Sequence, residues 1–386
     1  MSNRNDQSKK SFTAFDQGTT LLAVVELSRN FWLVAGIVPG IERQPSKKLA
    51  ADENKLLTLV RQWQQRAVKA GGEIKRIVVA FEAGRDGFWL ARWLRARGIE
   101  AYVIHATSIA VSREHRRAKT DRLDTEHLKR VVLGWLRGEP DHCRMVAIPT
   151  IEEEDAKRPN RERETLVREC TRIVNRMKAC LARFGVRGLN LTLRKAADQL
   201  ETLVTPEGMR LPPLTLAEML RDIARLRLLR EQIRIIEKAR VQRLKAAPVT
   251  RANMMVYLIA RVVGIGIETA DMLVHEILSR KLRDRRAVAR YAGLTGSPDE
   301  SGNRRREKGL ARAGNARVRR GMIQLAWRFL WLQKDSALAE WYRQRTQAAP
   351  ATRKTLIVAL ARKLLIALWR LAHDGIVPEG VQMRPA

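Results

Sequence analysis

FTAFDQGTTLLAVVELSRNFWLVAGIV (residues 12–38) contains three short runs rich in apolar and β-branched residues, separated by DQGTT and SRN. Glycine, serine and asparagine in these separators are typical of tight turns, and runs of this length are typical of strands. The segment predicts an antiparallel three-stranded meander. The polar residues 1–11 that precede it are predicted to be a disordered tail.

Strand and helix patterns alternate after this segment. A helical pattern over residues 52–71 is followed by the strand-like IKRIVVAFEAG (74–84), then by the helical FWLARWLRARG (88–98) and the strand-like EAYVIHA (100–106). Such alternation favours an α/β fold with a mixed sheet. We therefore predict one α/β domain over residues 12–150.

The rest of the chain gives only helical patterns. Residues 151–250 carry apolar residues near heptad spacing and predict a helical coiled-coil linker, either antiparallel or intermolecular. Residues 251–386 predict an all-α C-terminal domain with a Gly-rich polar loop at 293–315. Arginines on the linker's outer face are either solvated or track phosphates: Arg221, Arg225, Arg230, Arg234 and Arg240. Four tryptophans at helical spacing predict core or dimer packing: Trp327, Trp331, Trp341 and Trp369.

The charge balance points to a polyanionic partner. Lys and Arg number 74 against 41 Asp and Glu, which gives a net charge of +33. The chain has no signal peptide and no long uncharged apolar run, so a membrane is not the expected partner and a cytoplasmic location is. DNA or RNA is the expected partner. The three cysteines lack metal-site spacing, so any metal is expected to be held by oxygen.

Four carboxylates form a candidate constellation. Asp16 and Glu82 are each predicted to end a strand, and Asp121 and Asp124 stand three residues apart near the start of a predicted helix. Alone, Asp16 fits an Asx turn as well as it fits a binding site. Alone, Glu82 fits a solvated loop residue and the aspartate pair fits a helix cap. Together they could surround two Mg²⁺ ions, because Mg²⁺ prefers oxygen ligands, and two such ions can clamp the oxygens of a reacting phosphate.

The C-terminal region carries two further candidates. VGIG (263–266), with Gly264 and Gly266, predicts the turn of a helix-hairpin-helix, a module that holds a DNA phosphate. The Gly-rich loop combines Ser297 and Ser301 with many arginines. The expected nucleic-acid contacts, including those beside the aspartate pair, are Arg116, Arg117, Lys119, Arg122, Arg304, Arg305, Arg306, Arg312 and Arg317.

The order FDQG, FEAG, AKTDRLD resembles the RNase H-like fold of RuvC resolvases, and AKTDRLDTEHL is closer still to the DEDD transposases of insertion sequences, the IS116/IS110/IS902 family. Their C-terminal pattern is matched by Gly293-Leu294, Ser301-Gly302, Gly309 and Gly314-Asn315. Where that family has a Lys shortly after its first Asp, this chain has QGTT. The resemblance covers residues 12–345.

The resemblance implies a serine recombinase that is guided by a bridge RNA and forms dimers to tetramers, with each active site built from two subunits. It assigns Mg²⁺ to Asp16, Glu82, Asp121 and Asp124, and the nucleophile to Ser301, with Ser297 as the second choice. From the residues alone two other functions stay open. One is a metal-dependent nuclease or resolvase that uses water, and the other is a non-catalytic nucleic-acid-binding protein.

Overall fold

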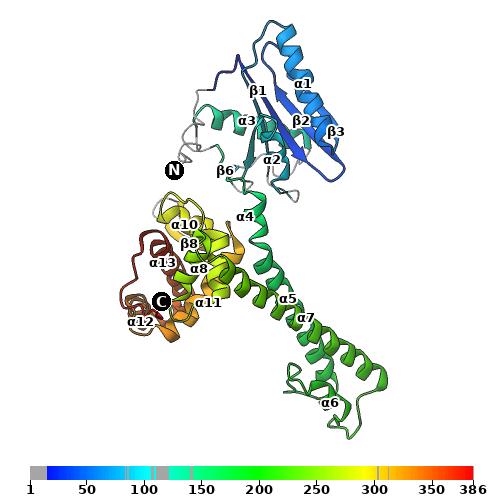
Figure 1. Ribbon diagram of the computed structural model, residues 1–386, viewed down its shortest axis with the longest axis vertical. Coiled ribbons are helices and arrows are strands. Elements are labelled where there is room, and N and C mark those ends of the chain that lie inside the picture. The colour runs from blue at the N-terminus through cyan, green and yellow to red at the C-terminus, as the bar shows by residue number, and fades with distance from the viewer. Residues whose placement is uncertain are drawn as a thin grey trace. The chain divides into compact units, whose positions relative to one another are not determined.

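The computed structural model of the protein describes residues 15–82, 84, 87–105, 108–109, 121–139, 142–301, 304–311 and 313–385. The side chains of residues 121–122, 298–301 and 304–308 are outside this description, as is the predicted tail of residues 1–11. The chain divides into two compact units, Met1–Glu152 and Glu153–Ala386, and each is described by itself (Figure 1).

The first unit contains a six-stranded sheet in the order β3-β2-β1-β4-β5-β6. β1, β4 and β5 run parallel, whereas β2, β3 and β6 pair antiparallel with their neighbours. The predicted mixed sheet is confirmed, and this topology fits an RNase H-like domain. The strands are β1 (Thr20–Leu27), β2 (Phe31–Ile37), β3 (Ser46–Ala50), β4 (Arg76–Glu82), β5 (Glu100–Ile104) and β6 (Met145–Val146).

The predicted meander exists, but one of its strands was wrongly assigned. β2 pairs with β1 on one side and with β3 on the other. The third strand is therefore Ser46–Ala50, whose exposed lysines are typical of a sheet edge. Asp16 lies in the turn before β1, where its carbonyl accepts a hydrogen bond from the Thr20 amide. The predicted strand before Asp16 is not formed at Phe15, and residues 12–14 are outside the description.

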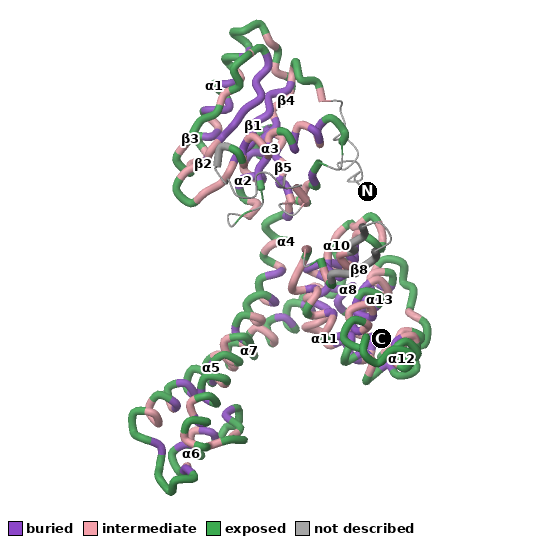
Figure 2. The backbone as a smooth tube through the Cα atoms, turned by 180° about the vertical axis from the view of Figure 1, so that it is seen from behind, coloured by how far each residue is buried: buried purple, intermediate pink, exposed green. Residues whose placement is uncertain are grey.

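Helices cover both faces of the sheet, and each face has its own core. α1 and α2 pack on the face that buries Leu21, Ala23 and Val25 of β1. α3 packs on the other face, which buries Leu22 and Val24. Figure 2 shows this buried centre along β1 and β4. The helices are α1 (Glu53–Lys69), α2 (Trp89–Arg95) and α3 (Asp121–Leu136).

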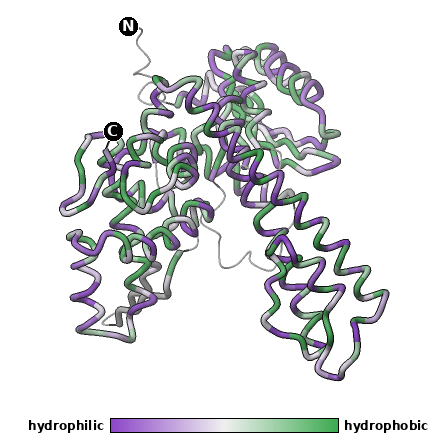
Figure 3. Tube along the Cα trace, turned by 60° about the horizontal axis from the view of Figure 1, so that its bottom comes forward, coloured by the Kyte–Doolittle hydropathy of each residue, from purple (hydrophilic) through white to green (hydrophobic). Residues whose placement is uncertain are grey.

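The second unit begins with a hairpin of two long helices, α5 (Arg158–Arg183) and α7 (Pro213–Ala246). Arg163 pairs with Glu237 and Arg176 with Asp222, so residue numbers rise along one helix as they fall along the other. The helices are therefore antiparallel. Apolar and polar positions alternate along both of them (Figure 3). Whether they supercoil as the predicted coiled coil stays a prediction. Two short helices precede α5 and α7 respectively: α4 (Ile151–Asp155), which crosses the boundary between the two units, and α6 (Ala196–Glu201).

The hairpin base joins the C-terminal helices through buried polar side chains. Arg240 of α7, which is 2% exposed, donates from Nε to Asp271 Oδ2 at 3.1 Å and from Nη2 to Asn160 Oδ1 at 2.9 Å. Asn160 Nδ2 in turn donates to Asp271 Oδ2 at 2.7 Å. The prediction that Arg240 lies on the outer face of the linker is thus wrong, because a buried carboxylate pairs with it.

The C-terminal part of this unit is mostly helical and packs around one apolar core. Its helices are α8 (Arg251–Ala260), α9 (Ile267–Leu273), the π-helix Val274–Leu278, α10 (Arg285–Tyr291), α11 (Ala316–Leu332), α12 (Ala337–Ala348), the 3₁₀ turn Pro350–Thr352 and α13 (Arg353–Asp374). Within the described residues, no helix has the length and apolarity needed to cross a bilayer.

This part is not all-α, contrary to the prediction. The predicted Gly-rich loop folds as a two-stranded antiparallel hairpin, β7 (Gly296–Ser301) and β8 (Arg304–Leu310). Its sequence carries charges where an amphipathic strand would carry apolar residues, so a strand pattern does not reveal it. Two-stranded pairs of this kind need support from their surroundings.

Candidate active site

Two glutamates stand at the same edge of the sheet. β1 and β4 are parallel, and their register pairs Val25 with Phe81. Glu26 and Glu82 are the next residue on each strand, so they lie side by side at the carboxyl ends of neighbouring strands. Parallel α/β sheets place their ligands at this edge.

Both glutamates face α3. On β1, Leu22 and Val24 point to the same face as Glu26, because they are alternate residues of one strand. Both contribute to the core beneath α3. On β4 the residues Val78 and Ala80 do the same before Glu82. Since side chains alternate between the two faces of a strand, Glu26 and Glu82 project toward α3.

The first turns of α3 approach this pair. Thr125, which is 1% exposed, donates a hydrogen bond from Oγ1 to Glu26 Oε2 at 3.4 Å. Asp124 precedes it and shares a helix face with Leu128, which packs into the core under α3. The half-buried Asp124 is therefore on the side of α3 that meets the sheet.

Asp16 does not join this group. It lies before the first residue of β1, and Glu82 lies at the end of β4, so the two are separated by the strand length, about 20 Å for six residue steps. Its carboxylate accepts hydrogen bonds from the Thr19 hydroxyl at 2.7 Å and the Gly18 amide at 2.9 Å. These bonds, with nearby Lys75, lower the pKa of Asp16. The sequence-based placement of Asp16 beside Glu82 is wrong, and the Asx turn is the correct reading.

Glu26 was not predicted as a site residue, although it lies one residue before the end of β1 and just before the SRN turn. The alternation Leu22, Val24, Glu26 was the available sign, since it puts a carboxylate on a face that is otherwise apolar. Arg29 follows Glu26 by three residues and is exposed. It supplies a cation shortly after the first acidic residue, where QGTT after Asp16 supplies none.

The donor chemistry of this edge suits a divalent cation. Carboxylate oxygens are the ligands that Mg²⁺ prefers, and Glu26 and Glu82 provide an adjacent pair. Within the described side chains no three His, Cys, Asp or Glu residues form a metal-holding group. The helix α3 begins at Asp121, whose side chain is outside the description, as is that of Arg122. Arg116, Arg117 and Lys119 are also outside it.

Ser301 is the last residue of β7, at the tip of the second hairpin. The register pairs it with Arg304, and pairs Glu300 with Arg305 and Asp299 with Arg306. Ser297 stands near the base of the same strand. The backbone thus brings Ser301 and three successive arginines of β8 to one end of the hairpin, although their side chains and Arg312 are outside the description.

Glycines close the base of this hairpin. Gly293 has φ +66°, and a Cβ there would lie 2.1 Å from the Ala313 carbonyl oxygen. Gly314 has φ +85°, and its Cβ would lie 2.5 Å from the Tyr291 carbonyl oxygen. Only glycine fits both the backbone conformation and the space. The two family-pattern glycines therefore fix where β7 leaves and β8 returns.

Asn315 caps the helix that follows the hairpin. Its Oδ1 accepts from the amides of Arg317 and Val318, and its Nδ2 donates to Glu276 Oε2 at 2.9 Å. Burial alone would raise the pKa of Glu276, but its hydrogen bonds and the charge of Arg161 lower it. Arg317 pairs with Glu164, so this predicted phosphate contact already has a carboxylate partner.

The predicted helix-hairpin-helix turn lies between α8 and α9. Gly264 has φ +96° and packs against Leu332. The Val263 amide donates to the Gln382 carbonyl, so this amide is occupied by the C-terminal segment. Gly266 precedes the first residue of α9. A DNA contact at this turn stays a prediction.

Known proteins resemble this chain over most of its length. A family model described as "Transposase IS116/IS110/IS902 family" matches residues 256–359, and a DEDD-type model described as "Transposase" matches residues 34–185. The second match begins after Glu26, so it does not assign the first acidic residue.

Two relatives cover both units. "Putative transposase y4rJ" of Sinorhizobium fredii is 41% identical over 370 residues, which span 93% of each chain. "Probable family 20 transposase" of Pseudomonas aeruginosa is 26% identical over 299 residues, 76% of this chain and 83% of the relative.

Proposed function

Because the chain belongs to the IS116/IS110/IS902 family of insertion-sequence transposases, we propose that it cuts and rejoins DNA with a carboxylate site and a serine nucleophile. The carboxylates are Glu26, Glu82, Asp121 and Asp124, and the nucleophile is Ser301, with Ser297 as the second choice. The observation that carries the proposal is the shared register of Glu26 and Glu82 beneath α3.

The carboxylates would hold a divalent cation, with Mg²⁺ as the expected ion. When bound, such a cation offsets phosphate charge and favours the deprotonated form of a hydroxyl group. Glu26 replaces the aspartate that the DEDD pattern would place first, and a glutamate is an equally hard oxygen ligand. Thr125 would hold the Glu26 carboxylate in place through its hydrogen bond.

The serine step conserves the phosphodiester energy. Oγ of Ser301 forms a bond to phosphorus as the bond from phosphorus to one DNA oxygen breaks, and the serine proton leaves to solvent while the released DNA oxygen gains one. Rejoining is the reverse with a different DNA hydroxyl. The arginines paired with β7 in the hairpin register, Arg304, Arg305 and Arg306, would stabilise the phosphoryl charge.

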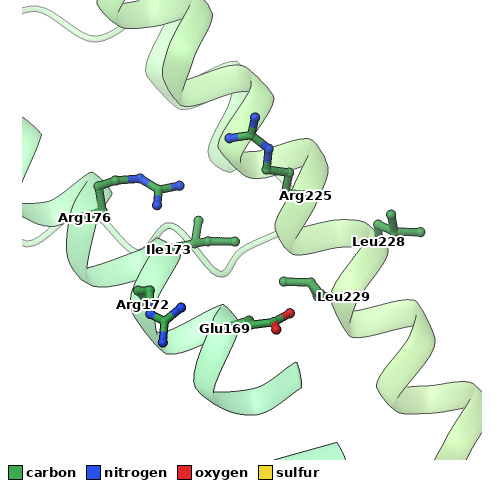
Figure 4. Close-up of a pocket in the computed structure, with 7 residues that line it drawn as sticks. All are labelled: Glu169, Arg172, Ile173, Arg176, Arg225, Leu228 and Leu229. Atoms are coloured by element: carbon green, nitrogen blue, oxygen red, sulfur yellow. The ribbon is translucent and has the colours of Figure 1, made fainter. Parts of the chain in front are cut away.

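The partners we propose are DNA, a bridge RNA encoded by the element, and further copies of the chain. The charge of +33 supports the first two. The helical hairpin of α5 and α7 supports the third partner, a further copy of the chain. Leu228 is 60% exposed and Ile235 is 57% exposed, and they lie seven residues apart on α7. Figure 4 shows Leu229 turned toward α5 and Leu228 turned away from it. These residues are therefore the proposed interface with another copy of the chain. If the Leu228→Glu variant had the same mass in sedimentation as the original chain, this interface would be refuted.

The test of the proposed function is a plasmid recombination assay combined with capture of covalent protein–DNA adducts. Ser301→Ala is expected to abolish both the adduct and recombination, while DNA binding persists. Ser297→Ala is the matched control within the same strand. Cleavage by Ser301→Ala without any adduct would instead indicate hydrolysis by water, and full recombination by that variant would refute Ser301 as the nucleophile.

A further inference from the structure

The face of α11 carries two tryptophans that the C-terminal core does not bury. Trp331 is 72% exposed and Trp327 is 42% exposed. Trp327 has Tyr342 at 6.4 Å between ring centroids and the Arg353 guanidinium 5.9 Å from its ring, so its own domain engages it. Trp331 makes no aromatic or cation contact with the described residues. Tryptophan is enriched at interfaces because its ring offers a large apolar surface, so an indole this exposed is a candidate contact for a partner.

Arginines share this face. Arg320, Gln324, Arg328 and Trp331 follow one another at spacings of four, four and three residues, which places them along one side of the helix. The sequence predicts that Trp331 packs in the core or in a dimer. Core packing is wrong, because this side of α11 is exposed to solvent.

The arginines also line a groove of about 440 Å³ between α5, α9 and α11. α5 contributes Arg163 and Arg168 to it, and α11 contributes Arg317, Arg320 and Arg328. Glu164 pairs with Arg317 and Arg320, and Glu237 with Arg163. Arg328 is exposed and has no ion pair among the described residues.

We propose that this face of α11 binds an unpaired stretch of nucleic acid, with Arg328 on a phosphate and Trp331 stacked on a base. Single-strand binding combines a cation on the phosphates with an open aromatic ring that stacks on a base. A duplex hides the faces of its bases, so it cannot offer this stacking contact. A second copy fits less well, because a twofold contact would set arginines against arginines. The inference rests on the proposed function only in that the chain acts on nucleic acid.

The test measures fluorescence anisotropy of labelled 12-nucleotide single-stranded DNA and RNA and of a 12-base-pair duplex with the full chain at several salt concentrations. Trp331→Ala is expected to weaken single-strand binding by about tenfold without changing the salt dependence. Trp331→Phe should recover most of the affinity. Arg328→Ala should reduce the slope of log affinity against log salt by roughly 0.7. The two single-stranded probes show whether RNA or DNA is preferred.

Matched controls are Leu214→Ala, which removes an apolar side chain 85% exposed on α7, and Arg362→Ala, which removes an exposed arginine of α13. The proposal fails if Trp331→Ala binds single strands like the original chain, if it weakens duplex binding equally, or if it changes the oligomeric state in light scattering. If the original chain bound none of the probes, the proposed function would fail as well.

Discussion

Glu26 and Glu82 project from neighbouring parallel strands onto the same face of the sheet, each one residue beyond the register pair Val25–Phe81. We predict that Glu26→Gln, which keeps size and removes charge, lowers recombination by about 100-fold or more, because the cation would lose a ligand. Recombination at fixed Mg²⁺ concentration measures it, and folding is checked by circular dichroism.

Asp16→Asn provides the matched comparison. Its carboxylate serves the turn with Thr19 and Gly18 at the other end of β1, so recombination should stay within about twofold of the original chain. Loss of activity in Asp16→Asn together with retention in Glu26→Gln would restore Asp16 to the site and remove Glu26 from it.

Arg240 and Asp271 form a buried pair whose disruption should be costly. Arg240→Ala leaves the fully buried Asp271 short of a partner and is expected to lower the free energy of unfolding by about 3–5 kcal/mol. Arg234→Ala removes an exposed pair with Glu231 from the same helix and should cost less than about 1 kcal/mol. Denaturant midpoints of the two variants give the comparison, and equal midpoints would contradict a role for the buried pair.

Acid should weaken the second unit. Burial would raise the pKa of Asp271 and Glu276, but hydrogen bonding, foremost from His275 to Asp271 and from Arg161 to Glu276, holds both pKa values below the ordinary 3.8 and 4.5. A lowered folded pKa means that the stabilisation is complete above the unfolded pKa and is lost as pH falls through the folded one. Thermal melts between pH 6 and pH 2 should therefore show a decline that begins below about pH 4.5. Glu276→Gln should flatten that decline, and an unchanged pH profile in this variant would exclude Glu276 as its source.

Gly314 and Gly309 allow a steric test of the β7–β8 hairpin. Both have positive φ, +85° and +84°, but a Cβ at Gly309 would meet nothing within 4 Å, whereas one at Gly314 would strike two carbonyl oxygens. Each alanine destabilises the fold by about 1 kcal/mol because of the left-handed backbone, and Gly314→Ala destabilises it further because of the collision. We expect Gly314→Ala to lower the melting temperature and recombination far more than Gly309→Ala. Equal effects would mean that the hairpin base is not closely packed.

The sheet was largely predictable because its strands carry strong apolar patterns between turn residues. Its edge strand was not, since Ser46–Ala50 has two lysines and no apolar alternation. Asp16 was predicted as a site residue because it precedes a turn, but Glu26 also precedes one. The alternation of side chains along β1 identifies Glu26, since Leu22 and Val24 fix the face of the sheet on which it lies.

Long-range pairing explains the other differences. Nothing near Arg240 in the sequence marks it as buried, because its partner Asp271 comes from another helix. The β7–β8 hairpin is likewise held by Gly293 and Gly314 at its base, while its strands are charged throughout. Local patterns predict such segments as loops because their order comes from tertiary contacts.

The buried cluster of Asn160, Arg240 and Asp271 joins the base of the α5–α7 hairpin rigidly to α9. Because close-packed, hydrogen-bonded interiors transmit displacement with little loss, a torque applied at the far end of the two long helices reaches the helices that carry the serine hairpin. The face of α7 with Leu228 and Ile235, which we propose binds another copy of the chain, belongs to the same hairpin, so assembly there would displace the helices that flank Ser301, the proposed nucleophile.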